Sequence, residues 1–370
     1  MNLLILSSST GGGHNMRANA LKYWWEQNGG SAKISQPLES SFILYRMGSN
    51  FYNFIQKVYP AFHFIYFNFL EIASLHRYRN LIFGANSWFE EIGRFKPDLV
   101  VSVHAHLNHG YYELLKERFS NDLKFVIYCG ELANGVGFSR HWVNPKVDYF
   151  LGPFEETCNA AIKRGMPANK TQVVGPLLRK AFYGEISEQQ KRSILSKHDI
   201  SHNLPIFLLG TGANGVNRHL NVLHSLQKYN SDYQVVALCG KNDKVFNEIF
   251  KIKDLFKFKI IPLRIIDDEA MALLLQSASF LFARPGAGTT TEAIVCGTPI
   301  IFDISRGVMP QEINNLNFWR NRSDSIVLCR NPKIINQLIE PRLPKIKMGT
   351  DSSPQVLINR LIEICGCSKR

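Results

Sequence analysis

The sequence predicts an α/β fold with two domains, each containing a parallel sheet and crossover helices. Short apolar runs alternate with helical patterns along most of the 370-residue chain, which is typical of parallel sheets. The succession of strand, glycine-rich loop and helix begins at residue 3 and begins again at residue 206. The intervening residues 176–205 are polar and lack a strand pattern, so we expect a linker and a first helix there.

Apolar runs mark the expected strands in chain order. The first half contains four such runs, at residues 3–6, 99–103, 125–128 and 149–151, with helices from about Arg17 and about Gly110. The second half contains six, at residues 206–209, 234–238, 259–262, 280–282, 299–302 and 326–328. We therefore expect an N-terminal domain of residues 1–178 and a C-terminal domain of residues 179–370, with the option that the last helix packs back on the N-terminal domain. Ligands are expected between the domains, at the carboxyl ends of the strands.

Composition narrows the kinds of partner. There are 43 Lys and Arg against 30 Asp and Glu, and this net charge of +13 favours nucleic acid, an acidic membrane or a phosphorylated ligand. The seven cysteines are scattered without a CxxC pair, which argues against a disulfide framework or cysteine metal site and favours a cytoplasmic location. The run at residues 3–6 is too short for a signal peptide, and no uncharged segment approaches the roughly 20 residues of a membrane span.

The stretch SSSTGGGHNMRANAL, residues 7–21, follows the first expected strand. Gly11, Gly12 and Gly13 lack Cβ atoms, so N–H groups at a helix N-terminus could closely approach an anionic or polyhydroxylated ligand. His14 stands where the loop meets the helix, and histidine is the usual general base near neutral pH. We interpret the stretch as a binding loop with a candidate catalytic base.

The strongest binding motif is ARPGAGTTTEAIVCGTPIIF, residues 283–302. The guanidinium of Arg284, the N–H groups near Gly286 and Gly288, and three successive threonine hydroxyls are expected to converge on a diphosphate. Glu292 would repel a phosphate but suits the two hydroxyls of a ribose. The pattern therefore indicates a nucleoside diphosphate site. The alternative is an ordinary helix N-cap, with a threonine as the cap and the glutamate near the third position.

A second glycine motif follows the strand that opens the second half. Gly210, Gly212 and Gly215 satisfy the G-x-G-x-x-G pattern of dinucleotide-binding loops. The acidic residue expected about 20 residues later is missing at a clear strand end, since Asp232 precedes the next strand. We interpret the motif as a loop lining the ligand site, and a tight strand-to-helix turn is the alternative.

Residues 40–71 carry a broad aromatic arc. Tyrosine recurs every seven residues from Tyr45 to Tyr66, and phenylalanines fall at helical spacing between them. Aromatic rings beside Arg46 and Lys57 suit a membrane interface with anionic lipid. A pair of core helices is the alternative, and the net charge favours the membrane.

Histidines gather in SVHAHLNH, directly after the expected strand at residues 99–103. His104, His106 and His109 could line the same site as His14. Zinc is not expected, because no acid or cysteine stands at matching spacing nearby. A structural histidine is the default interpretation of each one taken singly.

These stretches resemble monogalactosyldiacylglycerol synthases and related diacylglycerol glycosyltransferases. The resemblance rests on residues 7–21 and on five further blocks that run in family order over nearly the whole chain. These blocks are PDLVVSVHAHLNH (97–109), WVNPKVDYFLGPFEE (142–156), VVALCGKND (235–243), RPGAGTTTEAIVCGTPIIF (284–302) and PQEINN (310–315).

The resemblance implies a GT-B fold, in which two Rossmann-like domains face each other across a cleft. It also implies inverting transfer without a bound metal or other cofactor. The acceptor would bind the N-terminal domain, and the aromatic arc falls where relatives dock on the bilayer. His14 would lie at the reaction centre. Acceptor-binding residues would be Gly11, Gly12, Gly13, His104 and Trp142.

The resemblance further implies that the C-terminal domain binds a UDP-sugar. The uracil would meet the backbone of Ile266, the diphosphate would meet Thr289 and Thr290, and the ribose would meet Glu292. The sugar hydroxyls would be held by Gln311 and Glu312. The remaining expected donor-site residues are Gly212, Gly240, Asn242, Arg284, Gly286 and Gly288.

The chain departs from the family pattern in YCGELANGVGFSRHW, residues 128–142. Relatives carry an aspartate and a His-Pro pair before the tryptophan, whereas this chain has Glu131, extra glycines and the pair Ser139 and Arg140. Arg284 also stands where relatives commonly have lysine. Glu131 therefore becomes a second candidate base beside His14.

We expect a glycosyltransferase on the inner face of a membrane that moves a hexose from a UDP-sugar to a lipid hydroxyl, foremost that of diacylglycerol. The expected partners are the donor, the lipid acceptor and an anionic membrane surface, with no nucleic acid. One alternative is transfer to a polyprenyl-diphosphate-linked sugar, as in the related peptidoglycan N-acetylglucosaminyltransferase. Others are a non-catalytic membrane-associated UDP-sugar-binding protein and, more distantly, a dinucleotide oxidoreductase. Galactose, glucose and N-acetylglucosamine all stay open as the transferred sugar.

Overall fold

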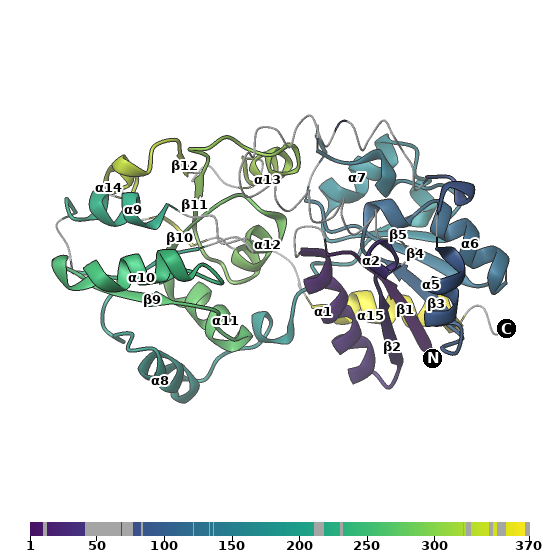
Figure 1. The fold of residues 1–370 in the computed structure, drawn as a ribbon, viewed down its shortest axis with the longest axis horizontal. Coiled ribbons are helices and arrows are strands. Elements are labelled where there is room, and N and C mark those ends of the chain that lie inside the picture. The colour runs from purple at the N-terminus through teal and green to yellow at the C-terminus, as the bar shows by residue number, and fades with distance from the viewer. Residues whose placement is uncertain are drawn as a thin grey trace. The chain divides into compact units, whose positions relative to one another are not determined.

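The computed structural model has two compact units, and each contains a six-stranded parallel sheet with helices on its faces (Figure 1). The α/β class expected from the sequence is confirmed. The first unit comprises Met1–Arg179, Met309–Phe318 and Asp351–Arg370, and the second comprises Lys180–Val308 and Trp319–Thr350. The structure describes residues 1–9, 13–40, 68, 77–82, 84–120, 122–132, 134–135, 137–210, 218–229, 232–320, 322, 327–339, 343–345 and 353–366.

The division differs from the sequence-based domains in one respect. The main boundary falls one residue later than expected, but the first unit also takes residues 309–318. The sequence analysis assigned that segment to the C-terminal domain because it follows the second run of strands. The last helix also belongs to the first unit, where it packs on the sheet.

In the first unit the strand order is β2-β1-β3-β4-β5-β6, and all pairs are parallel. Its strands are β1 (Asn2–Leu6), β2 (Ser31–Ser35), β3 (Leu99–Ser102), β4 (Lys124–Tyr128), β5 (Tyr149–Gly152) and β6 (Thr171–Val173). Its helices include α1 (Gly13–Gln27), α2 (Pro37–Ser40), α5 (Ala85–Ile92), α6 (Gly110–Arg118), α7 (Glu155–Lys163), α13 (Pro310–Arg320) and α15 (Gln355–Gly366). The short 3-10 helices are η2 (Arg79–Leu81), η3 (Ala105–Leu107), η4 (Arg140–Trp142) and η5 (Ala168–Lys170).

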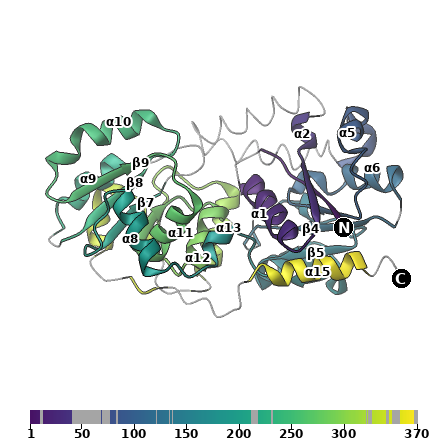
Figure 2. The ribbon, with the colours of Figure 1, turned by 90° about the horizontal axis from the view of Figure 1, so that it is seen from below.

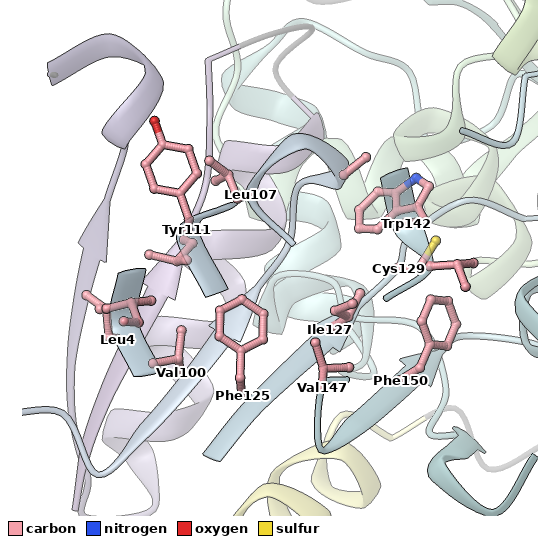
Figure 3. Close-up of a cluster of buried hydrophobic side chains, with 14 of the residues drawn as sticks. Leu4, Val100, Leu107, Tyr111, Phe125, Ile127, Cys129, Trp142, Val147 and Phe150 are labelled. Atoms are coloured by element: carbon pink, nitrogen blue, oxygen red, sulfur yellow. The ribbon is translucent and has the colours of Figure 1, made fainter. Parts of the chain in front are cut away.

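Alternate residues of β1 face opposite sides of this sheet, as the two-residue period of a strand requires. Leu3 and Ile5 pack with side chains of α1 and α15. Leu4 and Leu6 pack in a second cluster with side chains of α5, α6 and α7. Figure 2 shows α15 and α5 on opposite sides of the strands, and Figure 3 shows part of the second cluster. Burial on both faces explains why this strand is a continuous apolar run.

In the second unit the order is β12-β11-β10-β7-β8-β9, again with every pair parallel. Its strands are β7 (Ile206–Leu209), β8 (Gln234–Leu238), β9 (Lys259–Leu263), β10 (Ala278–Ala283), β11 (Ile300–Asp303) and β12 (Val327–Cys329). Its helices are α8 (Glu188–Lys197), α9 (His219–Leu226), α10 (Asp243–Ile252), α11 (Asp268–Ser277), α12 (Ala287–Val295) and α14 (Ile335–Leu338), with η6 (Lys180–Phe182), η7 (Lys253–Leu255) and η8 (Pro332–Ile334) among its described residues. Numbered from its own first strand, this is the 3-2-1-4-5-6 order of nucleotide-binding sheets.

The sequence analysis did not predict two strands of the first unit. β2 has the sequence SAKIS and β6 has TQV, and both occupy edges of the sheet. An edge strand needs fewer apolar side chains than a central one, so neither shows the run that marks a buried strand. The helix expected within residues 176–205 is present as α8, which begins with a capping box between Ser187 and Gln190.

None of the helices in the described ranges combines the length and the hydropathy that a bilayer crossing requires. The aromatic arc of residues 40–71 lies outside the described residues apart from Ser40 and Asn68. Its docking on a membrane therefore stays a prediction.

His219 makes the stability of the second unit sensitive to acid. Its side chain is 1% exposed, and one ring nitrogen lies 2.7 Å from the carbonyl oxygen of Leu238. Burial lowers the pKa of His219 from 6.5 to about 4. Between pH 6.5 and pH 4, His219 is therefore protonated in the unfolded chain but neutral in the folded chain. The free energy of unfolding falls as the pH drops through this range.

We expect wild-type protein to lose about 2 kcal/mol more unfolding free energy than His219→Gln between pH 7 and pH 5. Gln cannot titrate but can still donate to the Leu238 carbonyl. Urea unfolding of both proteins at the two pH values measures the difference. Equal losses would show that His219 does not cause the acid sensitivity.

Candidate functional site

The loops expected to bind ligand in the first unit lie where its strand order reverses. The chain leaves β1 towards β2 on one side and leaves β3 towards β4 on the other. Open α/β sheets bind ligands outside the carboxyl ends of strands at such a switch point. His14 follows β1, and His104 follows β3. The structure brings the two imidazoles together, with ring centroids 4.4 Å apart in an edge-to-face arrangement.

His14 is the second residue of α1, which begins earlier than the position near Arg17 expected from the sequence. Its Nδ1 lies 2.7 Å from the carbonyl oxygen of Val103. A carbonyl oxygen can only accept, so Nδ1 carries the proton and Nε2 has a free lone pair. Burial, followed by the charge of Arg17, lowers the pKa of His14 to about 4. The ring is therefore neutral at pH 7 and can accept a proton through Nε2.

Both rings beside His14 are buried. His104 is buried, and its Nδ1 accepts a hydrogen bond of 3.3 Å from the backbone N–H of His106. Trp142 is 2% exposed, belongs to the core cluster in Figure 3 and has its ring 6.2 Å from that of His14. Trp142 therefore packs beside the imidazole, and its expected contact with the acceptor stays a prediction. Among the described residues no group of three histidines, cysteines or acids is arranged to hold a metal ion.

A polar network holds the loop that follows β1. Ser8 donates through its hydroxyl to Oε1 of Glu39 at 2.7 Å, and the backbone N–H of Ser9 donates to the same oxygen at 2.7 Å. Ser7 donates to Oδ1 of Asn15 at 2.9 Å. The serines before the glycines thus fix the entry to α1, while Gly13 is its first residue. Gly11 and Gly12 lie outside the described residues.

Arg17 lies between the two candidate bases, and the sequence analysis gave it no role. Its guanidinium, 7% exposed as a residue, donates to the carbonyl oxygen of Gly130 at 2.8 Å. Burial raises the pKa of Glu131, whereas the positive charge of Arg17 lowers it. The same charge lowers the pKa of His14. Arg17 therefore favours both the ionised carboxylate and the neutral imidazole.

In the part of the chain that the structure describes, the side chain of Glu131 has fewer hydrogen-bond partners than its burial requires, unlike that of His14. Its Oε2 is buried and has no hydrogen-bond partner among the described residues. Its backbone carbonyl accepts a hydrogen bond of 2.5 Å from the hydroxyl of Thr157, which fixes the backbone rather than the carboxylate. The guanidinium of Arg17 therefore contacts the loop in which the chain departs from the family pattern.

Gly130→Ala is expected to detach Arg17 from this loop. A Cβ at Gly130 would lie 2.1 Å from Cζ of Arg17, so the guanidinium must move and its hydrogen bond is lost. Because the carbonyl is left without its charged donor, we expect about 1–3 kcal/mol lower unfolding free energy. Thermal unfolding of Gly130→Ala measures the loss, and Gly184→Ala is the control because a Cβ there meets nothing within 4 Å. An unchanged melting temperature would contradict the assigned contact.

The second unit has its own switch point, between β7 and β10. The backbone N–H of Gly210 donates to the carbonyl oxygen of Phe282 at 2.8 Å, so the loops after these strands start side by side. A Cβ at Gly210 would lie 3.0 Å from a methyl group of Leu281, which explains the glycine. Gly212 lies outside the described residues. The start of α12 follows β10 at this edge of the sheet.

The N-terminus of α12 has no side-chain cap. Gly286 is its N-cap residue, with extended backbone and no capping hydrogen bond, and a Cβ there would meet nothing within 4 Å. The threonine N-cap considered from the sequence is therefore wrong. The first N–H groups of a helix have no intrahelical partner, so this end presents donors and the positive end of the helix dipole. Arg284 lies two residues earlier and donates to the carbonyl oxygen of Gly307 at 3.1 Å.

The threonines differ from the expected convergence of three hydroxyls. Thr290 and Thr291 are buried, and their hydroxyls donate to the carbonyls of Gly286 and Ala287 at 2.7 Å. The N–H of Thr290 also donates to Gly286. Both the hydroxyl and the N–H of Thr290 thus donate within the helix, whereas the sequence analysis expected Thr290 to contact the diphosphate. Only Thr289, which is partly exposed, keeps the position expected of a ligand-facing threonine.

The other expected donor-site residues lie at the carboxyl ends of neighbouring strands. Glu292 is 4% exposed on α12, four residues after Gly288 and therefore on the same side of the helix. Gly240 follows β8 with a positive φ of 56°, where glycine is favoured. Asn242 caps α10 by accepting from the N–H of Val245. Ile266 follows β9 and is partly exposed.

The expected sugar-binding pair lies on α13, in the segment assigned to the first unit. Glu312 is 2% exposed, and its Oε2 accepts from the backbone N–H of Met309 at 2.9 Å. One carboxylate oxygen thus caps the helix, as in half of a capping box. Gln311 is in the first turn of the same helix. The structure therefore gives Glu312 a structural role that the sequence analysis did not consider.

Comparison with known families identifies the chain. Residues 14–178 match the model described as monogalactosyldiacylglycerol (MGDG) synthase, and residues 207–340 match the glycosyltransferase family 28 C-terminal domain. The first half of the chain therefore matches the MGDG synthase family, and the second half matches a glycosyltransferase family. The resemblance found in the sequence is confirmed, and with it the enzyme class.

Relatives of the chain come from bacteria and plants. The processive diacylglycerol beta-glucosyltransferase of Bacillus licheniformis is 23% identical over 380 residues, covering 98% of this chain and 94% of that protein. The chloroplastic monogalactosyldiacylglycerol synthase of Spinacia oleracea is 24% identical over 333 residues, covering 85% of this chain. The match spans 61% of the spinach protein's own length.

Solved structures show that the chain has the GT-B fold. MurG of Acinetobacter baumannii has a TM-score of 0.53 at 15% identity, covering 99% of this chain and 94% of that one. UGT89C1 of Arabidopsis thaliana complexed with UDP has a TM-score of 0.61 at 12% identity, covering 98% and 99%. A UDP-GlcNAc 2-epimerase from Neisseria meningitidis scores 0.59 at 12% identity, covering 98% and 100%. Since transferases and an epimerase share the fold, the fold alone does not define the reaction.

Proposed function

We propose that this enzyme transfers a hexose from a UDP-sugar to the free hydroxyl of diacylglycerol at a membrane surface, with inversion and without a metal ion. The observation that carries the proposal is the uncapped N-terminus of α12 at the switch point of the second unit. Helix N-termini of this kind bind phosphate groups in nucleotide-binding sheets.

The residues proposed to bind the donor place positive groups at the start of α12 and a carboxylate one turn later. This order matches the diphosphate and the ribose of a nucleoside diphosphate. The first N–H groups of α12 and the guanidinium of Arg284 favour the diphosphate. Glu292, one turn into the helix, is an acceptor suited to ribose hydroxyls. We assign the diphosphate to Gly288 and Thr289 rather than Thr290, because Thr290 donates within the helix. These donors supply the positive charge that a metal ion provides in other transferases.

The reaction proposed for this site is a single displacement. The acceptor oxygen forms a bond to the anomeric carbon while the bond from that carbon to the β-phosphate oxygen breaks on the opposite face. The electron pair leaves with UDP, and the charge that grows on the diphosphate is stabilised by the donors of α12 and Arg284. The hydroxyl proton passes to a base of the first unit. The configuration at the anomeric carbon is therefore inverted.

His14 suits the role of base better than Glu131. Its hydrogen bond to the Val103 carbonyl fixes the tautomer with Nε2 unprotonated, and its pKa of about 4 keeps it so at neutral pH. The carboxylate of Glu131 is oriented by no described hydrogen bond at Oε2. We therefore assign proton transfer to His14 and acceptor binding to Glu131, where the charge of Arg17 opposes the rise in the Glu131 pKa that burial causes.

The acceptor is inferred from relatives. The proteins of Bacillus licheniformis and Spinacia oleracea are named for diacylglycerol glucosylation and for monogalactosyldiacylglycerol synthesis. Both products join a hexose to the same lipid hydroxyl, which supports diacylglycerol here. The two names disagree on the sugar, so the donor must be identified by experiment.

The test is UDP release by the purified chain. UDP-glucose, UDP-galactose and UDP-N-acetylglucosamine are each supplied with anionic vesicles that contain diacylglycerol, a polyprenyl-diphosphate-linked sugar or neither. We expect release that requires diacylglycerol and one of the two hexose donors, with a glycolipid product of inverted anomeric configuration. Release only with the polyprenyl lipid would overturn the acceptor assignment, and UDP binding without any release would overturn the reaction.

A further inference from the structure

The second unit carries a cluster of exposed aromatic and aliphatic side chains ringed by cations, which we name the α10 surface. It is formed by residues 244–265, from α10 through η7 and β9 to the turn that follows. Phe250 is 54% exposed, Leu255 is 76% exposed and Ile265 is 68% exposed. Large apolar side chains scattered singly are normal on proteins, but these three fall within 16 residues of one another in the chain.

Ring and cation contacts connect the surface in space. The rings of Phe246 and Phe250 stack, with centroids 6.0 Å apart. The guanidinium of Arg264 lies 3.7 Å from the centroid of Phe246, and Nζ of Lys253 lies 5.3 Å from that of Phe250. Phe246 and Phe250 therefore form one aromatic pair with a cation against each ring, and the exposed Leu255 follows Phe250 by five residues in the chain.

The charge of this region is strongly one-sided. Residues 241–264 contain seven Lys and Arg against three Asp and Glu, so 24 residues carry a net +4 of the chain's +13. Two of the three acids are paired with cations: Asp243 lies 2.8 Å from Arg264, and Asp254 lies 3.5 Å from Lys253. The third acid is Glu248. Lys244, Lys251 and Lys257 are exposed.

We propose that the α10 surface docks the second unit on an anionic bilayer. Exposed rings and aliphatic side chains can enter the headgroup layer, while the surrounding lysines meet anionic lipid. Charge complementarity selects a bilayer with anionic headgroups over an uncharged apolar partner. The proposed function places the substrate in a membrane, but the docking itself requires no turnover. This surface is independent of the aromatic arc at residues 40–71.

The test is co-sedimentation of the full chain with vesicles of phosphatidylcholine alone or with phosphatidylglycerol added. We expect wild-type protein to bind the anionic vesicles selectively and to dissociate as salt rises. The double variant Phe250→Ser, Leu255→Ser should partition at least about 10-fold more weakly. Replacing Lys251 and Lys257 with Gln should weaken binding about 10-fold and flatten the salt dependence.

Ile334→Ser is the matched control, because Ile334 is a 39% exposed apolar residue of the same unit on η8. It should bind as the wild type does. The conservative variant Phe250→Trp guards against misfolding, since its added fluorescence should shift to the blue on anionic vesicles. Equal partitioning of the serine double variant, no spectral shift, or no binding by the wild type would each overturn the proposal. If the α10 surface bound a protein partner instead of lipid, the wild-type protein would not bind the vesicles.

UDP release from a soluble, short-chain acceptor separates this proposal from the proposed function. The α10 variants should release UDP at the wild-type rate with that acceptor and more slowly with vesicle-embedded diacylglycerol. If no acceptor supports release but anionic vesicles are still bound through Phe250 and Leu255, the transfer reaction fails while the docking stands.

Discussion

Gly286→Asp is expected to make the protein more stable and yet nearly unable to bind UDP. The backbone at Gly286 is already extended, with φ −72° and ψ 140°, and a Cβ there meets no atom within 4 Å. An aspartate fits and can cap α12, which should raise the unfolding free energy by about 0.2–0.4 kcal/mol. Its carboxylate then occupies the N–H groups and repels the diphosphate. We expect the UDP dissociation constant to rise at least about 100-fold, measured by calorimetry.

The opposite signs of these two effects make the experiment specific. Gly286→Ala adds the Cβ without the charge or the cap, so it should bind UDP within a few-fold of wild type. If the uncapped helix end were only a structural feature, Gly286→Asp would gain stability and keep its affinity. That result would remove the observation that carries the proposed function.

His14→Gln is expected to lower kcat by about 10²–10⁴-fold while leaving UDP binding intact. Glutamine can still donate a hydrogen bond towards the carbonyl oxygen of Val103, so the local packing is retained. It cannot accept the acceptor's proton as a base. Steady-state UDP release measures kcat, and UDP calorimetry provides the control because the residues assigned to the diphosphate and the ribose belong to the second unit.

The pH dependence distinguishes the two candidate bases. With a pKa of about 4, His14 stays able to accept a proton as the pH falls from 7 to about 5, so kcat/KM should be flat over that range and fall only near pH 4. Burial raises the pKa of Glu131, so a profile set by that carboxylate would fall at higher pH. Near-wild-type kcat in His14→Gln together with loss of activity in Glu131→Gln would reverse the assignment.

The sequence was sufficient to predict which loops lie at the carboxyl edge of each sheet. His14, His104, Gly210 and Gly286 all follow strands, and a loop after a parallel strand must emerge at the carboxyl edge of its sheet. The strand order, which no local pattern specifies, then brings β1 beside β3 and β7 beside β10. The expected proximity of His14 and His104 is confirmed for that reason.

The sequence could not show which hydrogen-bond partner each polar side chain has. A threonine in a helix can donate to the carbonyl four residues earlier, and Thr290 does so instead of facing outward. Glu312 reaches back to the N–H of Met309. Both choices depend on where the helix starts, and helix starts are poorly specified by sequence.

Arg17 illustrates a contact that sequence reasoning misses altogether. Its partner Gly130 lies 113 residues away in the chain, on the loop after β4. A glycine shows no chemistry of its own, so nothing in the local sequence indicates that its carbonyl needs a charged donor. The one available signal was the unusual composition of residues 128–142, which marked the loop as different without revealing its partner.

The interrupted make-up of the first unit has a practical consequence for dissecting this enzyme. Leu357, Ile358 and Leu361 of α15 are 1% exposed or less and pack with Leu3 and Ile5 of β1. A fragment that stops at residue 179 would leave that face of the sheet open to water, and such a fragment should aggregate. A circularly permuted chain that begins with α15 and joins it by a flexible linker to Met1 should instead keep this sheet covered. Permutation, rather than truncation, is the route to a separately expressed acceptor half.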